Sequence, residues 1–559
     1  MAAPSPDAAP VTITDESVVA MLILVNYDWY HGISCKRSPW HFLEGEQAVD
    51  AGNVMPYPYN PARWVAFRAR MTPGAPAFTV YGEPVSSYGS LNRDAARLAT
   101  RLEEHGVGIG ERVAYVGQNE RSLLLVALAA WRLGATFVPL NYRMPAAELD
   151  GILRSADPRL LVAGNGYESL ATELTASLTA GACLATCSGS ELTNLLAGLD
   201  EVPPKAGFAA TAPDDAAALL YTSGTTGLPK GVIWSFANIW WATTTHTLTT
   251  GGGAADVDLV MGPLVLAGPL FMLLSTWLTG GHIVTMNKFE PQHALDAIVR
   301  HRVTVAATSP MILQMLADAE GFPEADLGSV RYLVVGGGPI TPELLQRFVA
   351  RGVRVTQGYA MTETTGVATY LPPELIETKL GSAGLPLPMT ELKIVHGDGR
   401  PAGRDEIGEI LVRAPHVMAG YWRQPEAAST AIDADGWLHT GDAGRIDADG
   451  HLWVVDRIKD MIITGGLNVY AAEVEHVLSR IPGVAEIAVV GVPDARYGEA
   501  VIAVVVAADS APSLEQLRDR GRAELAGYKL PRRLVIVPEL PRNANGKVLK
   551  REIVRNLTS

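Results

Sequence analysis

Residues 221–231, Tyr-Thr-Ser-Gly-Thr-Thr-Gly-Leu-Pro-Lys-Gly, place glycines, hydroxyl side chains and one lysine directly after the apolar run at 216–220. Glycines let backbone N–H groups turn toward a ligand, hydroxyls donate short hydrogen bonds, and a lysine adds positive charge. The stretch therefore favours a phosphate-binding loop that follows a strand. It is not a Walker A loop, because Pro229 stands where that motif needs its second glycine. An ordinary solvated loop is the alternative, since runs of Ser, Thr, Gly and Pro commonly form one.

Two further strand ends carry residues suited to a nucleotide. Residues 332–339 are an apolar run that ends in three glycines and a proline, and the stretch 355–363 ends in Thr362 and Glu363. Glycine permits close backbone approach, an aromatic such as Tyr359 offers a face for a flat base, and Thr followed by Glu can hold a phosphate oxygen and a divalent metal. A turn with an incidental carboxylate is the alternative.

Two later turns each present one charged side chain. The glycine-bounded stretch 436–442 ends in Asp442, whose carboxylate can accept hydrogen bonds from both hydroxyls of a ribose. The stretch 541–547 contains Asn-Gly directly before Lys547, a tight turn that projects the lysine. The alternative for Lys547 is an exposed surface lysine, which is the usual place of that residue type.

Helical and extended patterns alternate over most of the chain, for example a helix at 342–350 followed by a strand at 353–356. Strands that are apolar throughout, and not only at every second residue, indicate an α/β fold with parallel sheets covered by helices on both faces. Short strands predict a small β subdomain at about 381–456. The chain from residue 460 predicts a compact α+β unit that includes a helix at 514–528.

The composition is that of an ordinary globular enzyme. The chain has 559 residues, of which 48% are hydrophobic and 19% charged, with a net charge of −14. The length predicts several domains, and the negative charge argues against nucleic acid or an anionic membrane as the main partner. Three cysteines give no disulfide framework, which favours a reducing cytoplasm. Residues 259–286 are long enough to span a bilayer, but Gly and Pro interrupt them, so we expect buried α/β core and no transmembrane segment.

Taken together and in order, these motifs resemble those of the adenylate-forming superfamily, which includes acyl-CoA synthetases, aryl-CoA ligases, luciferases and adenylation domains. The resemblance covers about residues 64–555 and rests on the stretches 222–231, 358–363, 436–442, 456–475 and 541–547. It implies a large adenylation domain at 63–456 built of two parallel-type sheets, a hinge at 457–459 and a smaller, mobile lid domain at 460–559. Residues 1–62 would form a tail and an extension packed on the large domain.

The resemblance also implies the residues that contact ATP. These are Thr222, Ser223, Gly224, Thr225, Thr226 and Gly227 in the phosphate loop, Gly336, Gly337, Gly338 and Pro339 around adenine, and Gly358, Tyr359, Ala360 and Met361 beside it. Tyr359 would stack on adenine, and Asp442 and Arg457 would bind the ribose hydroxyls.

Four residues would act on the reacting phosphates. Lys230 would hold the β- and γ-phosphates, Thr362 would contact the α-phosphate, and Glu363 would be the Mg²⁺ ligand. Lys547 would reach the α-phosphate during adenylation. The small domain would then swing about Lys459 and remove Lys547, so that residues 465–468 line a channel for the thiol of CoA.

The chain departs from the family pattern near the acid substrate. Phe236 stands where many members have His, and residues 263–268 lack the aromatic or His that helps to seat the substrate carboxylate. Ala360 replaces a frequent glycine. The candidate pocket residues are Trp241, Val265, Leu266, Met311, Gly337 and Ala360. None of them is charged, which favours an apolar or aromatic acid, and plain core packing is the alternative explanation of this aliphatic set.

The leading hypothesis is an AMP-forming acid–thiol ligase that adenylates a small apolar or aromatic carboxylic acid and transfers it to CoA, with ATP, Mg²⁺ and CoA as cofactors and co-substrate. One alternative is an ATP-dependent diazotase that activates nitrite for an aromatic amine, and another is transfer to a carrier protein. A catalytically silent nucleotide-binding protein is opposed by the joint presence of Lys230, Glu363, Asp442, Arg457 and Lys547. We expect a monomer or a homodimer.

Overall fold

The computed structural model describes residues 59–179, 181–188, 193–222, 229–338, 340–508, 510–543 and 546–558, which belong to one compact unit. Three predictions lie outside the described residues: the N-terminal extension as far as residue 58, the phosphate-loop residues 223–228, and Pro339. The structure describes every other predicted site residue.

A seven-stranded sheet forms the first layer of the large domain. Its strands in spatial order are β18 (Gly420–Tyr421), β8 (Lys230–Ser235), β7 (Ala216–Thr222), β4 (Thr136–Leu140), β3 (Arg112–Val116), β5 (Leu160–Ala163) and β6 (Cys183–Thr186). The strands from β7 to β6 run parallel, whereas β8 pairs antiparallel with β7 and with β18. Every residue of β4 and β5 is buried, as expected for strands with helices on both faces.

A nine-stranded sheet forms the second layer. Its strands in spatial order are β15 (Leu385–Pro386), β14 (Gly366–Leu371), β13 (Arg354–Met361), β12 (Tyr332–Val335), β11 (Val305–Thr308), β9 (Val257–Val260), β10 (His282–Thr285), β1 (Pro76–Val80) and β2 (Ser86–Ser87). The strands from β13 to β1 run parallel, and the strands beyond them on either side are antiparallel. The prediction of largely parallel sheets is confirmed for both layers.

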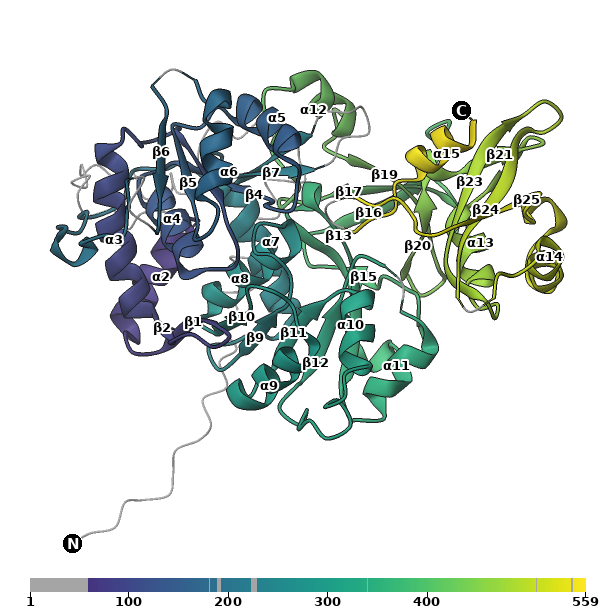
Figure 1. Ribbon diagram of the computed structural model, residues 1–559, viewed down its shortest axis with the longest axis horizontal. Helices are drawn as coiled ribbons and strands as arrows, with labels where there is room; N and C mark the ends of the chain where they lie inside the picture. The colour runs from purple at the N-terminus through teal and green to yellow at the C-terminus, as the bar shows by residue number, and fades with distance from the viewer. Residues whose placement is uncertain are drawn as a thin grey trace, which may run out of the picture. The chain divides into compact units, whose positions relative to one another are not determined.

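Helices cover both sheets and also fill the space between them. They are α2 (Pro61–Met71), α3 (Tyr88–Glu104), α4 (Arg121–Arg132), α5 (Ala146–Ala156), α6 (Glu168–Glu173), α7 (Phe236–Thr250), α8 (Ala267–Thr279), α9 (Pro291–His301), α10 (Pro310–Ala317) and α11 (Pro342–Val349). Helix α4 contacts β3 and β1, and α7 contacts β8 and β14, so these two helices lie between the sheets (Figure 1). All of α4 after Arg121 is buried, as its apolar sequence requires on every side.

Helix α7 follows strand β8 without a loop. Ser235 and Asn238 form a capping box at its start, in which each side chain accepts a hydrogen bond from the backbone of the other. Gly251 ends the helix with a left-handed φ of 66°, a conformation that favours glycine. The sharp start fixes α7 on the strand that carries Lys230.

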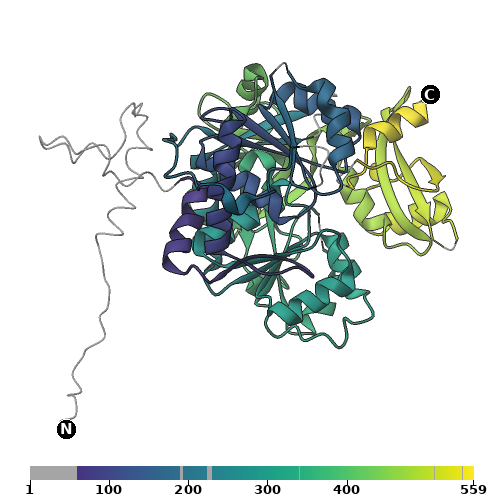
Figure 2. The same cartoon turned by 60° about the vertical axis from the view of Figure 1, so that its left-hand side comes forward.

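Two smaller sheets complete the fold. Strands β16 (Glu391–Val395), β17 (Gly408–Arg413), β19 (Leu438–Ile446) and β20 (Leu452–Arg457) form an antiparallel sheet, and α12 (Pro425–Ala431) lies between β18 and β19 in the chain. The C-terminal domain contains β21 (Ile462–Thr464), β22 (Leu467–Val469), β23 (Val484–Asp494), β24 (Gly498–Ala507) and β25 (Arg533–Val537) with α13 (Ala471–Leu478), α14 (Leu514–Arg522) and α15 (Lys550–Thr558). Figure 2 shows these green-to-yellow strands as a sheet with its own helices. The expected β subdomain and α+β C-terminal domain are therefore both present.

Two sequence predictions about single segments have different outcomes. Residues 259–286 form β9, α8 and β10 and contribute many buried side chains, which confirms the buried-core prediction. None of the helices in the described part of the chain is long and apolar enough to cross a membrane. The helix predicted at 514–528 is too long, because α14 ends at Arg522 and the chain forms a separate 3-10 turn at Gly527–Lys529.

Candidate active site

The two ends of the phosphate loop are held together. Strand β7 ends at Thr222 and β8 begins at Lys230, and these two residues pair across the antiparallel strands. As the apolar run at 216–220 predicts, a strand leads into the loop. The Nζ atom of Lys230 lies 4.8 Å from the centroid of the Tyr421 ring, within the range of a cation–π interaction.

Glu363 lies in a 3-10 turn, Thr362–Thr364, directly after β13. The Tyr421 hydroxyl donates a hydrogen bond of 3.0 Å to Glu363 Oε1, and Trp234 Nε1 donates one of 2.8 Å to the backbone carbonyl of Thr362. Burial raises the pKa of Glu363, while the Tyr421 hydrogen bond and the charge of Arg457 oppose that rise. The turn therefore holds a partly buried carboxylate beside the phosphate-loop lysine.

Asp442 joins two other predicted site residues. The Tyr359 hydroxyl donates to Asp442 Oδ2 at 2.6 Å, and Arg457 Nε lies 2.9 Å from Asp442 Oδ1. The pairing of β19 with β20 places Asp442 opposite Arg457. Asp442 is only 5% exposed, and Tyr359 and Arg457 are the two side chains that contact its carboxylate in the described part of the chain, whereas a carboxylate can accept about four hydrogen bonds. A buried carboxylate with an open acceptor is suited to a ligand hydroxyl.

The glycines at the strand ends differ in whether they leave room for a side chain. A Cβ at Gly336 or Gly337 would meet no atom within 4 Å, and Gly337 has a φ of +85° that favours glycine. The backbone after β12 is therefore open to a ligand. At Gly358, by contrast, a Cβ would lie 2.6 Å from the carbonyl oxygen of Thr369 on β14. The structure gives Gly358 a packing reason that the sequence did not indicate. Gly338 and Ala360 are exposed, and Met361 is partly buried.

The candidate acid-pocket residues come from α7, the segment before α8, α10 and the ends of β12 and β13. Val265 is 4% exposed, Trp241 and Leu266 are half-buried, and Met311 is 65% exposed. Gly337 and Ala360 are also exposed. Phe236, which stands where many family members have His, is fully buried in the core cluster.

Lys547 lies near the charges of Asp442 and Arg457, the two residues predicted to bind the ribose. Burial lowers the pKa of Lys547, and the positive charges of Arg457 and Lys459 lower it further. Lys459 belongs to a 3-10 turn, Ile458–Asp460, and burial lowers its pKa as well. The predicted hinge and the predicted catalytic lysine thus act on each other electrostatically.

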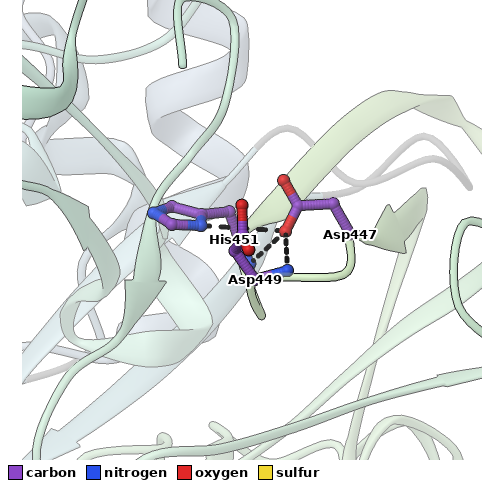
Figure 3. Close-up of side chains that lie close together, drawn as sticks. All are labelled: Asp447, Asp449 and His451. Atoms are coloured by element: carbon purple, nitrogen blue, oxygen red, sulfur yellow. Dashed lines mark hydrogen bonds and ion pairs between the residues drawn. The ribbon is translucent and has the colours of Figure 1, made fainter. Parts of the chain in front are cut away.

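A second cluster of possible metal ligands lies in the turn between β19 and β20. It contains the carboxylates of Asp447 and Asp449 and the imidazole of His451 (Figure 3). Asp447 Oδ1 accepts from the backbone N–H groups of Asp449 and His451 at 3.0 and 2.9 Å. Its Oδ2 accepts from Lys379 Nζ at 2.9 Å and Trp453 Nε1 at 3.0 Å. Lys379 also contacts Asp449 at 2.6 Å. Because the acceptors of Asp447 are filled and a lysine supplies the positive charge, this turn does not fit a metal ion.

The residues around Glu363 and Asp442 do fit ATP and Mg²⁺. A carboxylate is the ligand type that Mg²⁺ prefers, a lysine with no carboxylate partner among the described residues suits phosphate, and the Asp442 carboxylate retains acceptor capacity beside Tyr359 and Arg457. Sequence reasoning missed Tyr421, which links Lys230 to Glu363. An aromatic after a glycine is too common a pattern to have indicated it.

Comparison with known proteins agrees with this arrangement. The family model described as AMP-binding enzyme matches residues 65–422, and the model of the AMP-binding enzyme C-terminal domain matches residues 473–547. A feruloyl-CoA synthase from an Amycolatopsis species is 39% identical over 494 residues, which cover 88% of this chain and 98% of the relative.

Two solved structures are also similar. An o-succinylbenzoate CoA synthetase from Bacillus subtilis, in complex with its acyl-adenylate intermediate, has a TM-score of 0.80 at 32% identity and covers 88% of this chain and 97% of its own. The amide bond synthetase McbA from Marinactinospora thermotolerans has a TM-score of 0.80 at 32% identity, with 89% and 99% covered.

Proposed function

The chain belongs to the AMP-binding enzyme family and is an AMP-forming acid–thiol ligase, and from that premise we propose that it adenylates a small apolar or aromatic carboxylic acid and transfers the acyl group to CoA. The observation that carries the proposal is the convergence of the motifs on one electrostatic site. The Tyr359 hydroxyl and Arg457 Nε lie 2.6 and 2.9 Å from the Asp442 carboxylate, and the charges of Asp442 and Arg457 act on the pKa of both Glu363 and Lys547. Residues far apart in the sequence are therefore close enough to serve one ligand.

The chemistry of adenylation explains why these charges are needed. The carboxylate of the acid attacks the α-phosphorus of ATP, the bond to the β-phosphate oxygen breaks, and pyrophosphate leaves. One anion approaches another, so positive groups must face the phosphoryl oxygens where charge develops. Lys230 is assigned to the departing pyrophosphate and Lys547 to the α-phosphate. Glu363 would hold Mg²⁺, which would supply further positive charge to the phosphate oxygens.

The same site holds the nucleoside. Arg457 keeps the Asp442 carboxylate in place, with Nε 2.9 Å from Oδ1, and the carboxylate retains lone pairs that could accept a ribose hydroxyl. Tyr359 is held by its 2.6 Å hydrogen bond to Asp442, which fixes the ring that we assign to adenine. The open backbone at Gly336 and Gly337 leaves room for the base beside it.

We propose the class of acid from the residues of the candidate pocket, none of which is charged. Trp241, Val265 and Leu266 offer apolar surface, and none of the six candidates could neutralise a second carboxylate on the substrate. The relative named feruloyl-CoA synthase bears the name of an aromatic acid with one carboxylate, whereas the acid in the name of the o-succinylbenzoate CoA synthetase has two. An aromatic acid with a single carboxylate near the ligation site fits this chain.

Transfer to CoA is proposed to follow a movement of residues 460–559 about Lys459. After adenylation the thiol of CoA attacks the acyl carbon, the thioester forms and AMP leaves. Lys547 is no longer needed at that step, and residues 465–468, which form the turn after β21 and the start of β22, then face the acceptor. We place the reaction in the cytoplasm, where ATP and CoA are both available.

The test is a product screen by mass spectrometry. The protein is incubated with ATP, Mg²⁺ and a panel of benzoates, hydroxycinnamates, medium-chain acids and dicarboxylates, with and without CoA. AMP and a thioester are expected from the aromatic or apolar monoacids, with dicarboxylates the poorest substrates. Parallel arms replace CoA by an amine or a phosphopantetheine carrier protein, or replace the acid by nitrite with an aromatic amine. AMP release without consumption of CoA would contradict the proposed acceptor.

A further inference from the structure

Tyr421 lies between two opposite charges of the candidate site. Its hydroxyl donates to Glu363 Oε1 at 3.0 Å, and its ring centroid is 4.8 Å from Lys230 Nζ. Neither Lys230 nor Glu363 forms an ion pair with any residue that the structure describes. A lysine and a carboxylate that share one tyrosine therefore remain unpaired with each other.

The backbone holds Tyr421 at this place from both sides. Strand β18 pairs with β8, with Tyr421 opposite Val232, and the N–H of Trp422 donates to the carbonyl of Gly231 at 2.8 Å. On the other side, the N–H of Met418 donates to the carbonyl of Glu363 at 2.8 Å. The segment that carries Tyr421 is thus bonded to the strand of Lys230 and to the residue Glu363 itself.

A second tyrosine, Tyr81, also contacts one carboxylate and one cation, but there the two charges pair directly with each other. Tyr81 donates to Asp296 Oδ2 at 2.7 Å, and the guanidinium carbon of Arg300 lies 5.6 Å from its ring centroid. Here, however, Arg300 Nη2 also lies 3.1 Å from Asp296 Oδ2, one helical turn away on α9. At Tyr421 the two charges come from separate elements, and one tyrosine contacts both of them, Lys230 through its ring and Glu363 through its hydroxyl.

We propose that Tyr421 is a positioning residue that keeps Lys230 and Glu363 apart, so that the lysine stays free for phosphate and the carboxylate for Mg²⁺. A direct ion pair between them would satisfy each charge and compete with both ligands. A cation–π contact holds an ammonium without neutralising it, and a neutral hydroxyl can orient a carboxylate without removing its charge. The proposal rests on the proposed function, because it assigns phosphate and metal to these two side chains.

The experiment measures the affinity for ATP by calorimetry, once in EDTA and once in Mg²⁺, for variants that remove the hydroxyl or the ring. Tyr421→Phe keeps the ring, so the affinity in EDTA should stay within about twofold, while the gain on adding Mg²⁺ should fall by about tenfold, the scale of a lost hydrogen bond to a charged group. Tyr421→Leu removes the ring, so Lys230 can pair with Glu363, and the affinity in EDTA should also fall by about tenfold.

A double variant separates this role from a merely structural one. In Tyr421→Leu combined with Glu363→Gln, no carboxylate remains to capture Lys230, so the affinity in EDTA should recover toward that of the wild type. Tyr81→Phe is the matched control and should change neither measurement. An unchanged affinity in EDTA for Tyr421→Leu, or no recovery in the double variant, would overturn the proposal.

Two further outcomes are distinguishable. If Tyr421→Leu does not fold, as judged by circular dichroism, Tyr421→Phe decides alone, and a gain on adding Mg²⁺ equal to that of the wild type overturns the proposal. If the wild type itself binds no ATP, the proposed function fails, and the role of Tyr421 fails with it.

Discussion

Strand β19 carries one carboxylate, Asp442, and a second, Asp447, follows its end, but the two have different surroundings. Asp447 accepts four hydrogen bonds, including one from Lys379, and its neighbours complete a closed turn. Asp442 is more deeply buried, yet its carboxylate contacts only the side chains of Tyr359 and Arg457 in the described part of the chain. A carboxylate can accept about four hydrogen bonds, so Asp447 is filled whereas Asp442 keeps room for a ligand hydroxyl. This difference distinguishes the candidate ligand site from the structural turn.

The largest effect is expected at Lys547, whose charge has no carboxylate partner among the residues described. Lys547→Ala should reduce pyrophosphate exchange by about 10²-fold to 10³-fold, the scale of one lost preorganised contact, and leave ATP binding almost unchanged. The nearby Lys550 is the matched control, since it is paired with Glu475 at 2.7 Å and its replacement by Ala should not slow the reaction. Equal rates for Lys547→Ala and the wild type would remove the assigned role.

The two groups of carboxylates can be compared directly by a pair of amide substitutions. Glu363→Gln should lower the Mg²⁺-dependent adenylation rate by about 10²-fold, because the proposed metal ligand loses its charge. Asp449→Asn in the β19–β20 turn should leave the rate unchanged. Steady-state rates over a series of Mg²⁺ concentrations check both. If Asp449→Asn were the more damaging of the two, the distinction between the site and the turn would be wrong.

Asp258 tests whether an open acceptor always indicates a ligand site. It is 7% exposed, receives a hydrogen bond from Thr276, and its Oδ1 has no partner among the described residues. It lines a cavity of about 20 Å³ with His246 and Ser275, room for about one water molecule. Burial raises the pKa of Asp258 to about 7, whereas the unfolded value is 3.8. The stability it contributes is therefore fully present below about pH 4 and is lost as the pH rises through about 7.

Asp258→Asn should consequently raise the free energy of unfolding at pH 8 by on the order of 2 kcal/mol and have little effect at pH 4. Denaturant unfolding at the two pH values measures the difference, and adenylation should stay within about twofold. Loss of activity without a change in stability would instead make Asp258 part of a ligand site.

We expect the smallest effect from a substitution of Lys379, which pairs with Asp447 in the turn between β19 and β20. Lys379→Met leaves Asp447 without its charged partner, and both side chains are less than a quarter exposed in the pair. The free energy of unfolding should fall slightly, because solvent screens the lost ion pair, with no change in adenylation rate. Chemical denaturation and pyrophosphate exchange on the same preparation check this. A loss of adenylation at unchanged stability would show that the turn serves the reaction.

Much of the fold could be predicted from the sequence, because it depends on short-range patterns. Apolar runs such as 216–220 indicated parallel sheets, and glycines and prolines ended the elements. The helix at 514–528 was predicted too long, because its polar sequence has no clear end before Gly527. Such local patterns determine which elements form, but they locate the ends of elements less well.

By itself, the sequence determined the α/β class, the positions of the site motifs along the chain and the residues that carry charge. Only the tertiary structure decided which of those charges are satisfied. It pairs Asp447 with Lys379, leaves Lys230 and Glu363 on either side of Tyr421, and buries Phe236. The physical reason is that a hydrogen bond depends on distance and direction in space. Neither can be read from residues that lie far apart in the chain.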